Sequence, residues 1–289
     1  MQDKNDLIGK NLIPLAKYWS LRLGFLDIIN DTHLFIPQIE DREDIGDDIK
    51  VMIQASKNWK VNNEINVGEA GFLFRLLQFA SWKYGLGKRF IKEKTLKNRA
   101  ICDNPEIVSW PISELLKLDD NTTQWASAAI LTGNKEDAPD DYFLNLSKEA
   151  LAHYEKVKEK NEVCELRFDD TILKQAEAFV EYLKTKKINF TPIQPDDYCF
   201  ARAFNLITKE EGEKRWPELR SHESNRLEEM ERQLVNLKNN EEIDSHDHRV
   251  VQAIAMLATS QKKKINFPHL ECVSKSWPQF WDFLRLMLD

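Results

Sequence analysis

The chain of 289 residues contains little glycine, proline and cysteine, with 9, 10 and 4 residues of these types. The glycines and prolines are scattered, so no low-complexity linker marks a domain boundary. The cysteines lie far apart and form no C-x-x-C pair, which argues against a zinc site and against a disulfide framework. We therefore expect reduced, structural cysteines at Cys102, Cys164, Cys199 and Cys272.

Long apolar runs and an excess of positive charge are also missing. No window approaches the roughly 20 apolar residues that a membrane span needs, so we expect no membrane contact. The first residues mix charges with apolar side chains and show no signal-peptide pattern, which makes the cytoplasm the expected location. The 41 Lys and Arg against 48 Asp and Glu give a formal charge of -7, which argues against nucleic acid as a partner.

Bulky apolar residues are plentiful, with 8 Trp, 15 Phe and a hydrophobic content of 42%. They predict a folded globular protein, and the length suggests about two domains. Apolar residues with helical spacing predict helices over 69–82, from Ser224 onward, over 248–259 and over 277–288. The charged segment 149–162 is expected to form a solvated helix. Short β-like runs between the helices imply α/β layering, and these runs cover 33–36, 88–91, 165–168, 188–191 and 264–267.

Basic residues beside small residues or at helix starts are a further feature of this acidic chain. A single basic residue of this kind is equally well explained by a surface ion pair. Together they indicate a site for anions, because the planar guanidinium binds carboxylate and phosphate through two parallel hydrogen bonds, and helix N-termini add unpaired N–H groups. The basic residues concerned are Lys17, Arg22, Arg75, Arg99, Arg226, Arg249 and Lys275.

Seven segments around these residues match known motifs, in order along the chain. They are KYWSLR at 17–22 for K-S-x-S-x-R, GEAGFLFR at 68–75 for N-A-G-T-x-x-R, LKNRA at 96–100 for an R-P pair, NTTQWASAAIL at 121–131 for S-S-Q-x-x-S-A-L-L, ELRSHESNRLEEM at 218–230 for R-x-K-E-x-D-R, DHRVVQAIAML at 247–257 for D-H-R-M-A-M-A, and VSKSWPQFWDFL at 273–284 for x-K-S-F-P-x-F. The chain thereby resembles the enolpyruvyl transferase family over most of its length.

The resemblance implies an activity and two ligands. The family transfers the enolpyruvyl group of phosphoenolpyruvate to the 5-hydroxyl of shikimate 3-phosphate and releases phosphate, using neither a metal nor an organic cofactor. We therefore expect these two small anions as the partners of a monomeric protein of the shikimate pathway. By similarity, phosphoenolpyruvate would be held by Lys17, Gly71, Arg99, Gln124, Arg226, Arg249 and Lys275, and shikimate 3-phosphate by Ser20, Arg22, Thr122, Thr123, Gln124 and His222.

Catalysis through the family's tetrahedral intermediate needs proton transfer and stabilisation of negative charge. Asp196 is our candidate for the carboxylate that takes the hydroxyl proton, because the family has a Pro-Asp pair before its R-x-K-E-x-D-R segment. An alternative alignment places Asp196 on an earlier substrate-contacting strand, and in a purely structural role it would cap a helix. Glu223 is a second acid or base, with Lys17 and Lys275 as proton donors or charge stabilisers.

By resemblance, the fold is a two-domain inverse α/β barrel of repeated β-α-β-α-β-β units, with the active site between the domains. The chain is shorter than ordinary members of the family, so we expect a version reduced in size. We place residues 16–188 in a first lobe, which binds the acceptor. Residues 1–15 and 189–289 form the second lobe, which binds phosphoenolpyruvate and carries the catalytic groups.

Several residues depart from the motifs, mostly on the acceptor side: Tyr18 for Ser, Phe72 for Thr, Ala100 for Pro, His222 for Lys and Asn225 for Asp. Such changes alter size and charge at polar contacts. Two functions therefore stay open, an active but divergent transferase and a degenerate homologue that keeps an anion site and acts as a regulatory or interaction protein. Retention of the basic residues favours the first, whereas the shortened spacing and altered acceptor side favour the second.

Overall fold

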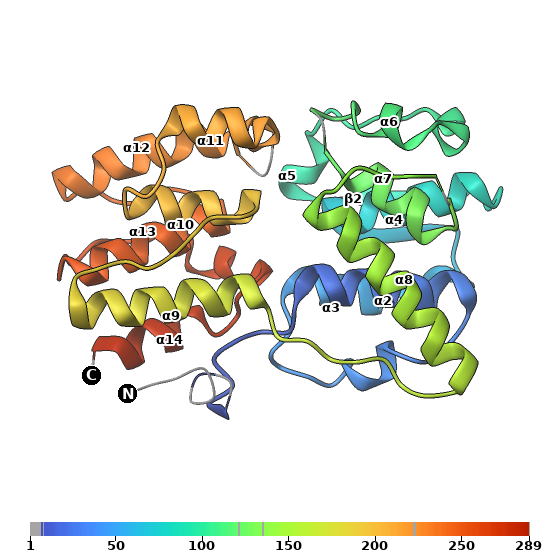
Figure 1. Ribbon diagram of the computed structural model, residues 1–289, viewed down its shortest axis with the longest axis horizontal. Coiled ribbons are helices and arrows are strands. Elements are labelled where there is room, and N and C mark those ends of the chain that lie inside the picture. Colours follow the sequence, from blue (N-terminus) through green and yellow to red (C-terminus); the bar gives the residue numbers. More distant parts are fainter. Residues whose placement is uncertain (1–6, 8, 121, 135, 222–223, 289) are drawn as a thin grey trace. The chain divides into compact units, whose positions relative to one another are not determined.

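The computed structural model describes residues 7, 9–120, 122–134, 136–221 and 224–288 (Figure 1). The chain divides into two compact units. Unit 1 comprises Met1–Leu15, Asp44–Gly46 and Phe168–Asp289, and unit 2 comprises Ala16–Glu43 and Asp47–Arg167.

These units differ in two places from the lobes expected from the sequence. Residues 168–188, expected in the first lobe, belong to unit 1, because apolar residues such as Phe179 are buried in its core. Asp44–Gly46 also belongs to unit 1, where the backbone N–H of Leu15 donates to the carbonyl of Asp44 at 3.0 Å. The boundary after residue 15 is the same in both divisions. Which substrate each lobe binds stays a prediction.

Unit 2 is built from helices and two short parallel strands (Figure 1). Strand β1 (Glu64–Gly68) pairs with β2 (Arg89–Lys92), and the register shifts before Gly68, whose φ of 52° glycine adopts without steric cost. Helix α2 is buried on most sides, so it forms the centre of the core and packs on α3, α4 and α8. The helices are α2 (Lys17–Asn30), α3 (Asp47–Trp59), α4 (Gly71–Lys83), α5 (Lys94–Lys97), α6 (Ile112–Leu115), α7 (Gln124–Leu131) and α8 (Tyr142–Lys160), with 3-10 turns η1 (Ile36–Gln38) and η2 (Pro105–Ser109).

Unit 1 is helical throughout its described regular elements. Helix α13 is its central element and packs on α10, α12, α14 and the turn η5. Side-chain caps begin several helices, since Asp169, Asn225 and Asp247 accept from backbone N–H groups of the first turn. The helices are α9 (Asp170–Thr185), α10 (Tyr198–Ala203), α11 (Lys209–Arg215), α12 (Arg226–Asn239), α13 (His248–Ser260) and α14 (Phe280–Leu288), with 3-10 turns η3 (Pro195–Asp197), η4 (Pro217–Arg220) and η5 (Leu270–Lys275).

The helices expected over 69–82, from Ser224, over 248–259 and over 277–288 are present as α4, α12, α13 and α14. The segment 149–162 is helical as expected, but it is not simply solvated, because α8 buries Tyr154 and Val157 against unit 2. In the described part of the chain, no helix combines the length and the apolar character that crossing a membrane requires.

Among the described residues, one of the five predicted β-like runs forms a paired strand. The run 88–91 is present as β2, and the sequence pattern does not predict its partner β1. The runs 33–36, 188–191 and 264–267 join no ladder among the described residues, and 165–168 contributes only an isolated bridge between Leu15 and Phe168. In the runs at 188 and 264, apolar side chains pack against the core of unit 1, so their burial does not require strand pairing. The inverse α/β barrel of repeated units stays a prediction.

One glycine marks a close backbone approach in unit 1. A Cβ added to Gly46 would lie 2.6 Å from the carbonyl oxygen of Lys275 and 3.2 Å from the Cα of Ser276. Backbone atoms cannot rotate away as a side chain can, so only glycine fits here. Gly46 therefore sets the distance between the short segment 44–46 and the end of η5.

Replacing this glycine tests that constraint. Gly46→Ala should lower the free energy of unfolding by about 1–3 kcal/mol, because the added methyl group overpacks a fixed backbone. Urea unfolding followed by circular dichroism measures the change. Gly9→Ala is the matched control in unit 1, since an added Cβ there meets nothing within 4 Å. Equal stability of the two variants would contradict the prediction.

Candidate functional site

Four buried charged residues of unit 1 form one hydrogen-bonded group, which we call the aspartate–arginine network. Its members are Asp196, Arg226, Asp247 and Arg249, and each is at most 3% exposed. Asp196 lies in the turn η3, Arg226 begins α12, and Asp247 and Arg249 lie at the start of α13. Asp196 and Arg249 are 53 residues apart in sequence, so the packing of three segments brings the network together.

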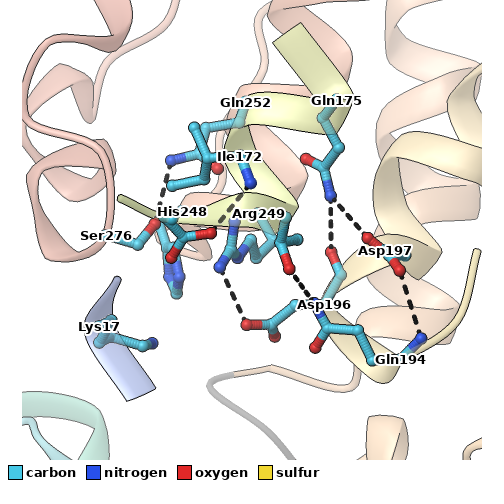
Figure 2. A network of polar contacts seen from close by, with 12 residues as sticks. Lys17, Ile172, Gln175, Gln194, Asp196, Asp197, His248, Arg249, Gln252 and Ser276 are labelled. Atoms are coloured by element: carbon cyan, nitrogen blue, oxygen red, sulfur yellow. Dashed lines mark hydrogen bonds and ion pairs between the residues drawn. The ribbon is translucent and has the colours of Figure 1, made fainter. Parts of the chain in front are cut away.

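The charges of the network alternate in sign. Arg249 Nη2 donates to Asp196 Oδ2 at 2.9 Å (Figure 2). Arg226 Nη1 donates to Asp196 Oδ1 at 2.9 Å, and its Nε donates to Asp247 Oδ2 at 2.9 Å. Asp247 Oδ1 also accepts from the backbone N–H of Arg249 at 3.0 Å. Each carboxylate thus contacts a guanidinium, which is the condition under which charges can be buried.

The network keeps Asp247 and Arg226 ionised. Burial by itself raises the pKa of the Asp247 carboxyl, but Arg226, His248 and hydrogen bonds outweigh burial and hold that pKa well below its usual range. Burial lowers the pKa of the Arg226 guanidinium, but the two neighbouring carboxylates outweigh it, and the pKa ends above its ordinary value. Both groups therefore carry full charge at neutral pH.

A third carboxylate, Asp197, lies beside the network and holds the backbone that leads into Asp196. Asp197 accepts a hydrogen bond from the backbone N–H of Ile193 at 2.9 Å. It also accepts from the backbone N–H of Gln194 at 3.3 Å and from Gln175 Nε2 at 3.1 Å (Figure 2). Burial raises the pKa of the Asp197 carboxyl despite these hydrogen bonds. The cap positions are Gln194 for η3 and Asp197 for α10, so the alternative of Asp196 as a helix cap is wrong.

A cluster in unit 2, which we call the Arg75 cluster, consists of Gly71, Arg75, Arg99, Asp119 and Gln124. Arg75 is buried on α4, and its Nε donates to Asp119 Oδ2 at 2.7 Å. Its Nη1 donates to Gln124 Oε1 at 2.8 Å and to the carbonyl of Gly71 at 3.3 Å. One guanidinium thus contacts two residues that the resemblance assigns to phosphoenolpyruvate.

Gly71 allows two guanidiniums to approach one point. A Cβ on Gly71 would lie 3.3 Å from Arg99 Nη1 and 3.4 Å from Arg75 Nη1. Burial lowers the pKa of the Arg75 guanidinium; Asp119 opposes this effect, and the positive charge of Arg99 adds to it. Both guanidinium groups therefore lie near Gly71, and Asp119 pairs with Arg75.

Thr122 and Thr123 are partly exposed and lie just before α7. The N-terminus of a helix attracts anions through its unpaired N–H groups and its dipole. Both threonines therefore lie at an end of α7 that favours anions.

The other predicted residues of unit 2, Lys17, Ser20 and Arg22, are buried on α2. Arg22 donates to Ser147 Oγ at 2.9 Å and to the carbonyl of Phe143 at 2.9 Å. It forms no ion pair with the described residues, and burial lowers the pKa of Arg22 to about 9. Lys17 Nζ lies 3.6 Å from Asp48 Oδ2.

The remaining predicted site residues are Lys275, His222 and Glu223. Lys275 ends η5 in unit 1 and is partly buried. His222 and Glu223 lie outside the described residues. Within the described ranges, no group of three or more His, Cys, Asp or Glu side chains is placed to hold a metal ion.

Sequence reasoning missed two carboxylates, Asp247 and Asp119. Asp247 had a signal, because an Asp directly before the helical run at 248 is typical of a cap. Asp119 had none, since it lies 44 residues from its partner Arg75. The sequence marks Arg75 as a basic residue, but residue spacing does not predict its contacts with Gly71 and Gln124.

The first prediction from this geometry concerns stability. Asp247→Asn keeps an oxygen that caps α13 but removes one of the two negative charges that neutralise Arg226. Breaking a buried pair costs about 3–5 kcal/mol, and urea unfolding at neutral pH measures the loss. Asp282→Asn is the control, because the pair of Asp282 with Arg285 at 3.1 Å is exposed and should contribute less than about 1 kcal/mol. A loss no larger than that of the control would contradict the role of Asp247.

The second prediction concerns pH. The pKa of the Asp247 carboxyl is lower in the folded chain than the value of about 4 expected when unfolded, so its stabilisation is complete above about pH 4 and is lost as the pH falls below it. The raised pKa of Asp197 acts in the opposite direction in both proteins, so the difference between wild type and Asp247→Asn isolates Asp247. That difference in unfolding free energy should shrink on acidification, and a constant difference would contradict the prediction.

Comparison with known proteins adds one short, local match. Over 47 residues the chain is 51% identical to the 3-phosphoshikimate 1-carboxyvinyltransferase of Clostridium beijerinckii, a stretch that covers 16% of this chain and 11% of that protein. No family model and no solved structure matches the chain. The match suggests a relationship to the enolpyruvyl transferases over a small part of the chain.

Proposed function

We propose that the protein is a divergent enolpyruvyl transferase that moves the enolpyruvyl group of phosphoenolpyruvate to the 5-hydroxyl of shikimate 3-phosphate and releases phosphate. The observation that carries the proposal is the contact of Asp196 with both Arg226 and Arg249, at 2.9 Å each. These residues come from separate segments that resemble motifs of the family. They combine a candidate base with two candidate anion ligands. The local identity of 51% to a named 3-phosphoshikimate 1-carboxyvinyltransferase supports the same reaction.

The two arginines suit phosphoenolpyruvate, because its phosphate and its carboxylate both fit the guanidinium fork. Asp196 and Asp247 already neutralise these arginines, so an incoming anion competes with the carboxylates. Exchange of Asp196 for a substrate oxygen keeps each guanidinium beside a negative charge. The exchange also releases the Asp196 carboxylate to accept a proton from the acceptor.

Asp196 then acts as the general base. The 5-hydroxyl oxygen forms a bond to C2 of phosphoenolpyruvate, and its proton passes to Asp196. The methylene carbon receives a proton from Lys275, which lies in the same unit as Asp196. The resulting tetrahedral intermediate loses phosphate and one methyl proton, which restores the carbon–carbon double bond. Arg226 and Arg249 stabilise the negative charge that develops on the leaving phosphate.

The Arg75 cluster contributes positioning. The fork of Arg75 holds the Gln124 amide and the Gly71 carbonyl, and Asp119 in turn holds Arg75. Arg99 supplies a guanidinium beside Gly71 for an anionic ligand. A side chain fixed by several hydrogen bonds loses little entropy when it binds a substrate.

One observation favours the second function left open by the sequence, an anion-binding homologue without catalysis. The four charges of the aspartate–arginine network sum to zero, and all four side chains are buried. Such a self-neutralised network also stabilises a fold that turns over no substrate. A measurement of turnover separates the two functions.

The decisive experiment follows phosphate release from phosphoenolpyruvate with and without shikimate 3-phosphate. We expect release that depends on the acceptor, and loss of the general base in Asp196→Asn should lower kcat at least about 100-fold. Asp282→Asn, on the exposed surface of α14, should keep the wild-type rate. Circular dichroism checks that each variant is folded.

Absence of acceptor-dependent release from the folded wild-type protein would overturn the transferase. Calorimetric binding of phosphoenolpyruvate without turnover would instead support the non-catalytic homologue. Release that Asp196→Asn leaves unchanged would retain the transferase but reject Asp196 as its base.

A further prediction concerns Arg75. Arg75→Lys keeps the charge but cannot donate to Asp119 and Gln124 together in the fork geometry. We expect KM for phosphoenolpyruvate to rise about tenfold, with a smaller change in kcat, because ground-state binding is lost. Arg89→Lys, on an exposed ion pair of β2, serves as the matched control. An unchanged KM would show that Arg75 has no positioning role.

A further inference from the structure

Unit 2 contains a cavity of about 500 Å³ that none of the predicted site residues lines. It lies where the C-terminal ends of α2 and α3 meet the loop of residues 31–40. Pockets of this volume hold small molecules in many proteins. The lining combines a buried apolar wall with charged side chains at the rim.

The wall of the cavity is a well-defined structure. Ile28, Ile36 and Trp59 line it and are buried. Asp27, which also lines it, accepts hydrogen bonds from the three backbone N–H groups of residues 34–36 at 2.9–3.1 Å. This carboxylate fixes the loop against the end of α2. The apolar wall therefore has a set shape that suits an apolar group of a ligand.

The rim carries two ion pairs of opposite charges. Lys57 Nζ lies 3.3 Å from Glu40 Oε2, and Lys60 pairs with Asp31. All four side chains line the cavity and are exposed. Exposed ion pairs contribute only about 0–1 kcal/mol, so a ligand can replace either partner at little cost. A ligand with both charges replaces both partners and leaves no charge unpaired.

The surrounding helices favour one orientation of such a ligand in the cavity. Both α2 and α3 end at the cavity, and the C-terminus of a helix carries a partial negative charge that favours cations. The buried Asp27 carboxylate adds negative charge on the same side. An ammonium group is therefore favoured beside Asp27 and Asp31 at the end of α2. A carboxylate is favoured beside Lys57 and Lys60, whose positive charges offset the dipole at the end of α3.

We propose that this cavity of unit 2 binds a free α-amino acid with an apolar side chain. The ammonium group contacts Glu40 or Asp31, the carboxylate contacts Lys57 or Lys60, and the side chain packs against Ile28, Ile36 and Trp59. The proposal does not depend on the transferase activity, because the cavity contains none of the residues assigned to that reaction.

Calorimetric titration with L-phenylalanine and two analogues tests the need for both charges. Phenethylamine lacks the carboxylate and 3-phenylpropionate lacks the ammonium group, while all three compounds share the aromatic ring. We expect L-phenylalanine to bind with Kd below about 1 mM and each analogue to bind at least about tenfold more weakly. Failure of L-phenylalanine to bind, or equal binding of all three compounds, would overturn the proposal.

Variants then locate the binding site. Glu40→Gln and Lys57→Gln should each weaken L-phenylalanine binding about tenfold, and Ser56→Phe should abolish it by filling the cavity that Ser56 lines. Lys50→Gln is the matched control, because Lys50 forms an exposed ion pair with Asp47 on the same helix outside the cavity. If the three cavity variants bind as the wild type does, the site lies elsewhere and the proposal is wrong.

The shift of Tm on adding ligand is a second measurement, and it also shows whether each variant is folded. L-phenylalanine should raise the Tm of the wild type and of Lys50→Gln in a concentration-dependent manner, but not that of Ser56→Phe. Phosphate release is measured separately on the same protein. Amino-acid binding without phosphate release would reject the transferase alone, and the reverse result would reject only the cavity site.

Discussion

An arginine can be buried in a protein core only when its charge is neutralised or its donors are satisfied, and this constraint shapes both units. In unit 1, Asp196 and Asp247 alternate with Arg226 and Arg249, so that each buried guanidinium contacts a buried carboxylate. Removal of one carboxylate would leave a buried positive charge. Three segments of unit 1 meet at this network, namely η3, α12 and α13, and their packing depends on it.

Unit 2 satisfies its buried arginines in two other ways. Arg75 has one carboxylate, Asp119, and shares its remaining donors with Gln124 and Gly71. Arg22 has no ion pair with the described residues and donates to hydroxyl and carbonyl oxygens, and burial lowers its pKa accordingly. The first arrangement places charge and amide groups in fixed positions, which suits the proposed role in binding an anion.

Local and long-range interactions meet at the starts of helices. Asp247 caps α13 through the backbone N–H of Arg249 and also accepts from Arg226 Nε, so one side chain begins a helix and joins it to α12. Asp197 in turn holds the backbone next to Asp196. The candidate base is thus positioned by backbone contacts rather than by its own ion pairs alone. This arrangement explains how short helices present charged groups with little freedom of movement.

The sequence by itself determined α4, α12, α13 and α14, because a repeat of apolar residues with helical spacing is a local property. It also identified Asp196, Arg226 and Arg249 as candidates, through motifs that resemble one family. Only the tertiary structure decided that these three residues share hydrogen bonds. It also decided that Asp247 accepts from Arg226 and that Arg75 donates to Gln124. The apolar runs at 188 and 264 pack against the core of unit 1 and join no ladder among the described residues. The physical reason is distance along the chain: periodicity and caps act within a few residues, whereas buried charges find partners 21 to 53 residues away.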